Sequence, residues 1–303
     1  MVATVRVLNP GDTTKPDPFT ICIVANPALE RRFGSGTFVP DPITTNQPLF
    51  DASAARIADT LFGRMPGQRE NIFADPAMAA AVRIVSIFDP ALTIEDKNSL
   101  AAEDNQSDNM LIARRTVAQP FLTRHGFSAD VSYAVSNSPT HTRASAFFTT
   151  DDDTAPGISF RLDGRVLTHR FRCIIPGTIA IHVQMRVLTA LHEFQHAISS
   201  YSNGSIVDLY VDSGVGVNNK RKRPIPLSFG AYNTTALQSD RTRDGLGYPG
   251  SWRSFHCELH APMVPAVMDD YNQARPPATP EQCENDKITR AFVIDRMRAK
   301  MNR

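Results

Sequence analysis

The sequence predicts a mixed α/β fold in a chain of 303 residues. Two apolar runs rich in β-branched residues, 19–25 and 80–88, are typical of buried strands. Between them, the apolar residues of 50–62 recur at the spacing of one helix face. A strand, a helix and a strand in this order form a crossover unit, so at least part of the sheet is expected to be parallel.

The middle of the chain predicts a loop, a helix and further strands. The stretch 95–108 is acidic and polar, which indicates a surface loop, whereas 110–122 has helical spacing. Strand-like runs follow at 131–135 and 143–149. The acidic cluster 151–153 lacks the spaced oxygen ligands of a calcium loop, so we expect it at the surface.

A hairpin and two helices are predicted further along. The dipeptide Asp163-Gly164 separates two alternating segments of 158–171, which is the pattern of a β-hairpin. Residues 179–200 place apolar side chains on one side of a helix. A final helix is expected over 284–301, and its buried stripe consists of Ile288, Phe292 and Met297.

The chain is expected to form a single domain over 1–303. The sheet-and-helix half, 1–203, carries the most informative helix, whereas 204–280 is rich in Gly and Pro and irregular. We therefore expect the half 204–303 to be irregular and to end in a helix. Neither an internal repeat nor a flexible linker divides the two halves.

The composition excludes several classes of protein. Lys and Arg number 32 against 31 Asp and Glu, a net charge of +1, which argues against nucleic acid as a partner. No stretch reaches the roughly 18 apolar residues of a membrane helix, so a membrane partner is not expected either. The oligomeric state is not indicated.

The cysteines and the N-terminus bear on the compartment. The 4 cysteines are scattered, and whether Cys257 and Cys283 pair depends on a redox environment that the sequence leaves open. Residues 1–7 lack a basic segment followed by an apolar one, so no signal peptide is visible. We expect a cytoplasmic protein, or a secreted one whose leader has been removed.

The helix over 179–200 carries His192-Glu193-Phe194-Gln195-His196, an H-E-x-x-H pattern. Histidines four residues apart lie one turn apart on one helix face, so both imidazoles can bind a single Zn²⁺. Glu193 lies beside the first ligand, where it can take a proton from the zinc-bound water and pass it to the leaving amine. The pattern thus predicts His192 and His196 as metal ligands and Glu193 as the general base.

The alternative is a solvated helix face that happens to carry two histidines and a glutamate. The polar residues, however, form one stripe of a helix whose opposite side is apolar, and a mostly buried helix needs partners for such a stripe. This argument favours the metal site. The polar stripe consists of Thr189, His192, Gln195, His196 and Ser199.

A catalytic zinc site requires a third protein ligand. Ser202 stands six residues beyond His196, so the compact pattern with a third histidine there is not met. Asp208 is the preferred ligand, because the turn Asn203-Gly204 can return the chain toward the helix. The alternatives left open are Asp212, His256, Glu258 and His260.

At this point the sequence resembles the IgA-peptidase-type zinc metallopeptidases, whose signature is H-E-x-G-H followed by L-x-D-E-Y. The motif helix and the segment Ile206-Val-Asp-Leu-Tyr210 carry the resemblance, which implies a zincin-like fold and Asp208 as the matching acid. Gln195 replaces the family glycine, Leu209 stands where the signature has Glu, and the acid lies further from His196.

Two later segments are candidates for the walls of the site. The segment 251–263 places His256, Glu258 and His260 next to Trp252, the one tryptophan of the chain. The segment 265–271 resembles the methionine turn found under the metal of many such enzymes, and its Tyr271 could donate to an oxyanion. For Met268 we favour a role in the core.

The sequence therefore predicts a zinc metallopeptidase with one catalytic Zn²⁺ and a peptide or protein substrate. An edge strand beside the motif helix, within 158–171, is expected to bind the substrate backbone by strand addition. The alternatives are a non-catalytic zincin-scaffold protein and a zinc hydrolase of non-peptide amides. Glu193 favours an enzyme, because a structural metal site needs no base.

Overall fold

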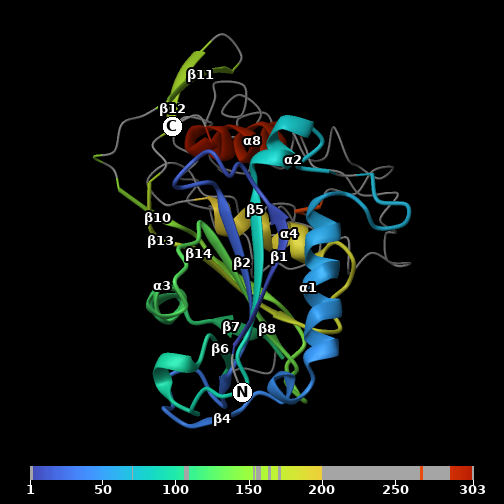
Figure 1. The fold of residues 1–303 in the computed structure, drawn as a ribbon, viewed down its shortest axis with the longest axis vertical. Helices are drawn as coiled ribbons and strands as arrows, with labels where there is room; N and C mark the ends of the chain where they lie inside the picture. The colour runs from blue at the N-terminus through green and yellow to red at the C-terminus, as the bar shows by residue number, and fades with distance from the viewer. Residues whose placement is uncertain are drawn as a thin grey trace, which may run out of the picture.

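The structure, a computed structural model, describes most of the first two hundred residues and the C-terminal helix (Figure 1). None of the helices in this part of the chain is long and apolar enough to cross a membrane. The described residues are 3–69, 71–105, 109–152, 154, 158–162, 165–169, 172–199, 267–268 and 287–301.

A six-stranded mixed sheet forms the centre of the fold, with the strand order β1-β5-β2-β8-β14-β9. The four inner strands are parallel, and the two outer strands run antiparallel to their neighbours. The fold is therefore mixed α/β, as predicted. The bounds are β1 Thr4–Pro10, β2 Thr20–Ala25, β5 Arg83–Phe88, β8 Val131–Ser136, β9 Ser145–Phe147 and β14 Gly177–His182.

The predicted crossover unit is confirmed. From β2 the chain passes through α1 (Gln47–Leu61) and α2 (Pro76–Ala81) to β5, which pairs with β2 in parallel. The side chain of Asn46 caps α1 by accepting a hydrogen bond from the N–H of Leu49. The expected start of the second strand at residue 80 is wrong, because α2 continues to Ala81.

Helices cover both faces of the sheet and enclose two cores. In β2, Ile21 and Ile23 lie in the larger core under α1, whereas Cys22 and Val24 face the other side. The second core lies under α3 (Arg115–Arg124), in the connection from β5 to β8. The connection from β2 to β5 therefore runs over one face of the sheet, and the connection from β5 to β8 runs over the opposite face.

The stretches 95–108 and 110–122 differ from the prediction. The first contains the 3₁₀ helix η2 (Asp96–Asn98) and a buried strand, and the second begins with a strand before α3 starts. These strands belong to a four-stranded sheet. They are short and lie among polar residues, so the sequence pattern does not predict them. The order of this sheet is β4 (Phe38–Pro40), β3 (Ala28–Glu30), β6 (Ala101–Glu103) and β7 (Leu111–Ala113); the 3₁₀ helix η1 (Pro42–Thr45) follows β4.

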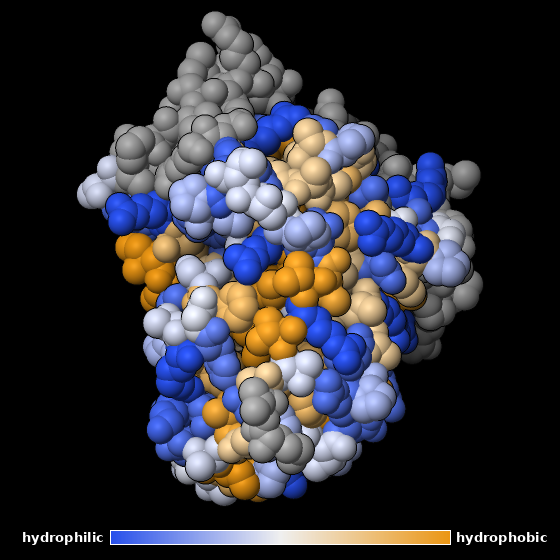
Figure 2. Space-filling view, in the orientation of Figure 1, coloured by the Kyte–Doolittle hydropathy of each residue, from blue (hydrophilic) through white to orange (hydrophobic). Residues whose placement is uncertain are grey.

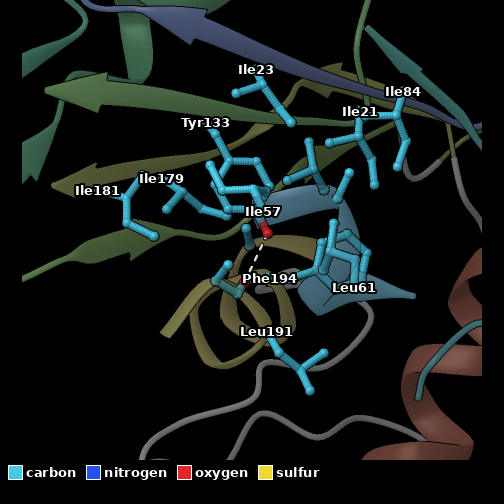
Figure 3. Packing of buried hydrophobic residues seen from close by; sticks show 14 of the residues in the cluster. Ile21, Ile23, Ile57, Leu61, Ile84, Tyr133, Ile179, Ile181, Leu191 and Phe194 are labelled. Carbon is cyan, nitrogen blue, oxygen red and sulfur yellow. Dashed lines mark hydrogen bonds between the residues drawn. The ribbon is translucent and has the colours of Figure 1, made fainter. Parts of the chain in front are cut away.

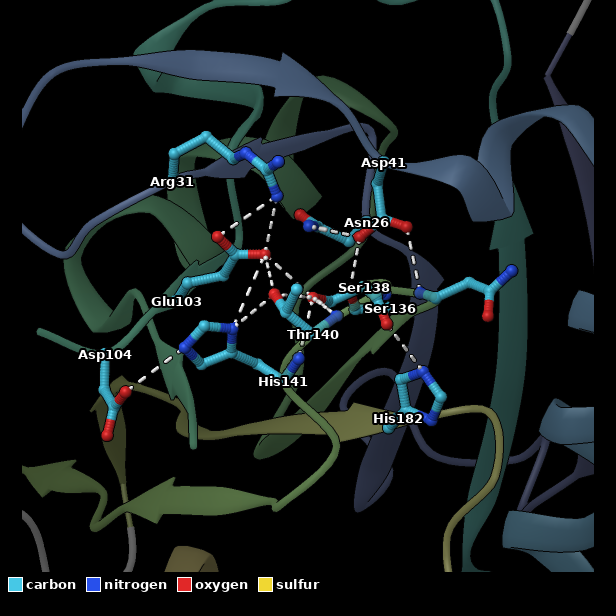
Figure 4. A network of polar contacts seen from close by, with 11 residues as sticks. Asn26, Arg31, Asp41, Glu103, Asp104, Ser136, Ser138, Thr140, His141 and His182 are labelled. Carbon is cyan, nitrogen blue, oxygen red and sulfur yellow. Dashed lines mark hydrogen bonds and ion pairs between the residues drawn. The ribbon is translucent and has the colours of Figure 1, made fainter. Parts of the chain in front are cut away.

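A buried polar network joins the small sheet to the carboxyl ends of β2 and β8 (Figure 4). Asp41 accepts hydrogen bonds from the side chains of Asn26 and Ser136. Glu103, on β6, accepts from Arg31 at 2.9 and 3.2 Å. Asn26, which follows β2, accepts from the N–H groups of Leu100 and Ala101 at 2.9 and 3.3 Å, and Ser138, beyond β8, donates to Glu103 at 2.8 Å. These buried contacts connect the ends of β2 and β8 to β6.

The helix expected over 179–200 is correct only in its second half. Residues 177–182 form β14, and α4 covers Thr189–Ile198. The alternation of Ile179 and Ile181 with small residues is typical of a strand buried on both faces. A short apolar run of this kind can equally be part of a buried helix, which is why the sequence alone does not distinguish the two. Tertiary pairing with β8 decides for the strand.

The predicted hairpin is confirmed as β11 (Ile158–Leu162) paired antiparallel with β12 (Arg165–His169). It forms a two-stranded sheet of its own, seen at the top of Figure 1. The run 143–149 holds β9, and β10 (Thr150–Asp151) follows and pairs with β13 (Cys173–Ile175).

The final helix, α8 (Lys287–Met301), packs against the body of the protein, and Met297 is buried as predicted. The expectation that 151–153 lies at the surface is wrong for Asp151, which is buried and paired with Arg296. A carboxylate can be buried when a cation lies against it, and the partner comes from 145 residues further along the chain. The side chains of Ile288 and Phe292, and almost all of 204–280, lie outside the described residues.

β1 lies at the edge of the main sheet and exposes one of its two faces. Arg6 pairs with Asp51 of α1 at 2.8 Å, and Leu8 packs against the larger core. On the opposite face, Val5 and Val7 are 44% and 57% exposed. Figure 2 shows apolar side chains gathered in the middle of the face over the strands labelled β1, β2 and β5 in Figure 1.

Candidate functional site

The H-E-x-x-H motif lies on α4, which packs against the main sheet beside α1 (Figure 3). Its inward side chains belong to the larger core, and Phe194 is fully buried. The ring of Phe194 meets those of Phe19 and Phe73 edge-on, with centroids 6.5 and 6.3 Å apart. Such aromatic pairs add to the burial of apolar surface, so this side of α4 is firmly held.

Tyr133, in the middle of β8, fixes the first turn of α4. Its hydroxyl donates a hydrogen bond of 2.8 Å to the backbone carbonyl of Ala190 (Figure 3). Burial raises the pKa of Tyr133 well above its usual value, and the negative charge of Glu193 raises it further. The hydroxyl therefore keeps its proton, and Glu193, itself only 8% exposed, lies near it.

The two histidines of the motif face one another. Their Nε2 atoms are 3.3 Å apart, and the ring planes are inclined by 82°. His192 Nδ1 lies 2.7 Å from the backbone carbonyl of Val267. Because a carbonyl can only accept, Nδ1 of His192 carries a proton, and in the neutral ring Nε2 presents its lone pair toward His196.

This geometry fits a tetrahedral zinc ion. Two nitrogen ligands at 2.0–2.1 Å from a tetrahedral metal lie about 3.3–3.4 Å from each other, and the Nε2 atoms of His192 and His196 are separated by 3.3 Å. Zinc-binding histidines also commonly donate their second ring N–H to a carbonyl or carboxylate, as His192 does to Val267. The two histidines could therefore hold zinc.

The predicted site residues are partly brought together. His192, Glu193 and His196 share one turn and a half of α4. Within the described residues, no group of three or more His, Cys, Asp or Glu side chains comes together as a metal site. The five candidates for the third ligand lie outside those residues; they are Asp208, Asp212, His256, Glu258 and His260.

The polar stripe of α4 is more buried than a solvated face would be. Gln195 and Ser199 are fully buried, whereas His192 and His196 have intermediate exposure. Met268 is 1% exposed and belongs to the larger core, as expected, and the turn that it shares with Val267 lies against α4. Thr189 is also of intermediate exposure, so the accessible part of the stripe consists of Thr189 and the two histidines.

The substrate strand was expected within 158–171, where the structure places the hairpin β11–β12. The hairpin β11–β12 is separate from the main sheet. The outermost strand on the α4 side of that sheet is β9, which pairs with β14 and packs against α4. The strong hairpin pattern of 158–171 identifies a pair of strands but carries no information on which sheet they join.

Two groups that hold the site were missed from the sequence. The carbonyl of Val267 is a main-chain atom and leaves no trace in residue type. Tyr133 could have been found, because a tyrosine in a strand predicted to be buried requires a partner for its hydroxyl.

Comparison with known protein families, with curated proteins and with solved structures finds no match for this chain.

His182 ends β14 and helps to position the turn that leads into α4. Its Nδ1 accepts a hydrogen bond of 3.0 Å from the N–H of Gln184, so the ring proton is on Nε2. Nε2 in turn lies 3.1 Å from the carbonyl of Ser138 (Figure 4). Burial lowers the pKa of His182 from its usual 6.5, since the ring is held neutral.

Acid is expected to weaken the fold through His182. The unfolded chain takes up this proton near pH 6.5 and the folded chain only at lower pH, so the contribution of His182 is complete above pH 6.5. It decreases as the pH falls below 6.5 toward the folded pKa, by at most about 1.4 kcal/mol per pH unit. Urea unfolding at several pH values should show a flatter acid slope for His182→Asn than for the wild type. The pKa of His125 is also lowered, but His125 is present in both proteins. Equal slopes would contradict the assignment.

Proposed function

We propose that this protein is a zinc-dependent metallopeptidase with a zincin-like fold. The observation that carries the proposal is the pair of Nε2 atoms of His192 and His196, 3.3 Å apart, with His192 oriented by the carbonyl of Val267. This spacing suits two ligands of a tetrahedral zinc. A mixed sheet with an antiparallel outer strand beside the motif helix supports the fold assignment.

Glu193 is the proposed general base. A zinc ion at the histidine pair would polarise the scissile carbonyl and lower the pKa of a bound water to about 7. The Glu193 carboxylate would accept a proton from the attacking water and donate it to the leaving nitrogen. Its low exposure of 8% supports this role, because the carboxylate is largely shielded from bulk water and directly follows the proposed ligand His192 in the chain.

The proposed substrate is a peptide in an extended conformation, aligned with β9. The outer strand of a sheet offers backbone N–H and C=O groups to an added strand, and β9 packs beside α4. Backbone pairing would bring a peptide bond past the motif helix with little dependence on side chains. This position replaces the hairpin 158–171 as the proposed substrate strand.

Zinc binding tests the proposal directly. Metal analysis of the purified wild type should find one zinc per chain, and His196→Ala should lose it, because one nitrogen ligand cannot hold the ion alone. His141→Ala is the matched control, since it removes a histidine that pairs with Glu103 and Asp104 away from α4. A wild type that carries no zinc and takes none up would contradict the proposal.

The third ligand can be found by the same measurement. We expect Asp208→Ala to lower the zinc affinity sharply while Asp212→Ala leaves it unchanged. Unchanged affinity in Asp208→Ala would transfer the assignment to one of the other candidates, namely Asp212, His256, Glu258 and His260.

A further inference from the structure

The carboxyl end of α4 is held by groups from two other parts of the chain. A helix leaves its last four carbonyls without partners in the helix. At this end, the Oγ of Ser199 donates to the carbonyl of His196 at 2.7 Å. Thr149, between β9 and β10, donates its N–H and its hydroxyl to the carbonyl of Ser199, at 2.8 and 2.9 Å.

Arg296 of α8 provides the second support. Its Nε donates to the carbonyl of Ile198, the last residue of α4, at 3.3 Å. Its Nη2 reaches Asp151 at 2.6 Å and the hydroxyl of Thr149 at 3.3 Å. The guanidinium is fully buried, so these contacts are shielded from water and from salt. One side chain therefore connects α8, the β9–β10 segment and the end of α4.

The charge of Arg296 also suits this position. The carboxyl end of a helix carries a partial negative charge, which a cation within the last turn stabilises. Asp151 balances the buried cation on its other side. The planar, forked guanidinium can donate hydrogen bonds to the helix carbonyl and to the carboxylate in fixed directions, a geometry that a single ammonium group does not offer.

The last turn of α4 matters because it contains His196. α4 has only 10 residues, and an isolated helix of that length is marginal in water. Helix ends fray first, and fraying would move His196 relative to His192, which lies one turn earlier. The 3.3 Å spacing of the two Nε2 atoms therefore depends on a fixed carboxyl end.

We infer that Arg296 is a positioning residue that sets the metal affinity of the histidine pair by anchoring the end of α4 to Asp151 and Thr149. The inference rests on the proposed function, because it assigns the consequence of the anchor to a zinc site. In this proposal the C-terminal helix α8 supports the metal site from outside, and none of its side chains is a ligand.

α8 offers a matched control one turn further on. Lys300 is also nearly buried, and its ammonium group binds Asp130 at 2.8 Å and Asp17 at 3.0 Å. These partners flank β2 and β8, and neither belongs to α4. Loss of Lys300 therefore removes a buried cation from α8, as loss of Arg296 does, but leaves the anchor of α4 intact.

The test compares Arg296→Met, Arg296→Lys and Lys300→Met in the full chain. Zinc affinity is measured by competition with a chromogenic chelator, and coordination by the visible absorption of the Co²⁺ form, which reports tetrahedral geometry. We expect Arg296→Met to bind zinc about 10-fold to 100-fold more weakly and to change the Co²⁺ spectrum. Arg296→Lys should recover part of the affinity, and Lys300→Met should stay within about 2-fold of the wild type.

Hydrogen exchange of the metal-free proteins gives an independent reading. The amides of the last turn of α4 should exchange faster in Arg296→Met than in Lys300→Met. If Arg296→Met does not fold, the affinity and exchange of Arg296→Lys decide in its place. Equal changes in the Arg296 and Lys300 variants would overturn the inference, because they would show a general role in stability. Failure of the proposed function would look different: the wild type itself would bind no zinc.

Discussion

Replacing Glu193 by Gln is expected to lower kcat for peptide hydrolysis by about 10²–10⁴-fold, the usual contribution of a general acid–base group. Glutamine has nearly the same shape as glutamate, so the packing beside Tyr133 is kept, but the amide cannot accept the proton. The zinc content should stay at the wild-type level, because Glu193 is not a proposed ligand. The measurement is hydrolysis of casein and of a short fluorogenic peptide, together with metal analysis of the same samples.

Two outcomes would separate the competing interpretations. Glu95→Gln is the control, since it makes the same chemical change at a side chain that is 41% exposed and far along the chain from the motif. If the wild type binds zinc and hydrolyses neither substrate, the zincin-scaffold alternative gains support. If Glu193→Gln remains as active as Glu95→Gln, Glu193 is not the base. Activity on an amide that is not a peptide would favour a zinc hydrolase of non-peptide amides.

Much of the sheet could be predicted because its inner strands are apolar on both faces. The strands 19–25 and 131–135 stand out for this reason, and the helix 50–62 stands out because its apolar residues lie on one face; the structure contains them as β2, β8 and α1. The same property misleads where a buried strand meets a helix. Residues 179–182 read as the first turn of a helix, because a short apolar run fits either period. Pairing with β8 supplies the missing information, and it is not local.

Polar segments that are buried by tertiary contacts were also mispredicted. The polar sequence around Glu103 predicts a surface loop, and the burial of Glu103 is explained by Arg31, which lies 72 residues earlier in the chain. The acidic cluster around Asp151 likewise predicts an exposed side chain, and the pairing of Asp151 with Arg296 explains its burial. A single sequence shows the charge of each residue but not the distant partner that makes its burial favourable.

The helical spacing of the motif histidines can be predicted, because the geometry of H-E-x-x-H is local. Residues four apart on a helix face the same way whatever the rest of the fold does, so His192 and His196 could be paired from sequence. The carbonyl of Val267, which orients His192, comes from 75 residues away and has no side-chain signal. A main-chain group that orients a side chain is therefore harder to predict than the side chains of the motif.

Gly177→Ala is expected to destabilise the fold by about 3 kcal/mol, at the upper end of the usual cost of overpacking. Gly177 begins β14 at the point where α4 crosses it. A Cβ at this position would lie 2.0 Å from the carbonyl oxygen and 2.6 Å from the carbonyl carbon of Ala197. The obstacle is main chain, so no change of rotamer can relieve it, and α4 must move away from the sheet.

The displacement should also reach the histidine pair, because Ala197 directly follows His196. Urea denaturation should show the loss of stability, and zinc titration should show weaker binding. Gly34→Ala is the control: its φ of +81° disfavours alanine, but its Cβ would meet nothing within 4 Å. That variant should cost only about 1–2 kcal/mol, the price of the left-handed backbone, and leave zinc binding unchanged. If the two variants were equally stable and bound zinc equally well, the close approach of β14 and α4 could not be what holds the motif helix in place. A larger loss at Gly177, where the backbone is not left-handed, would show that the contact itself fixes α4.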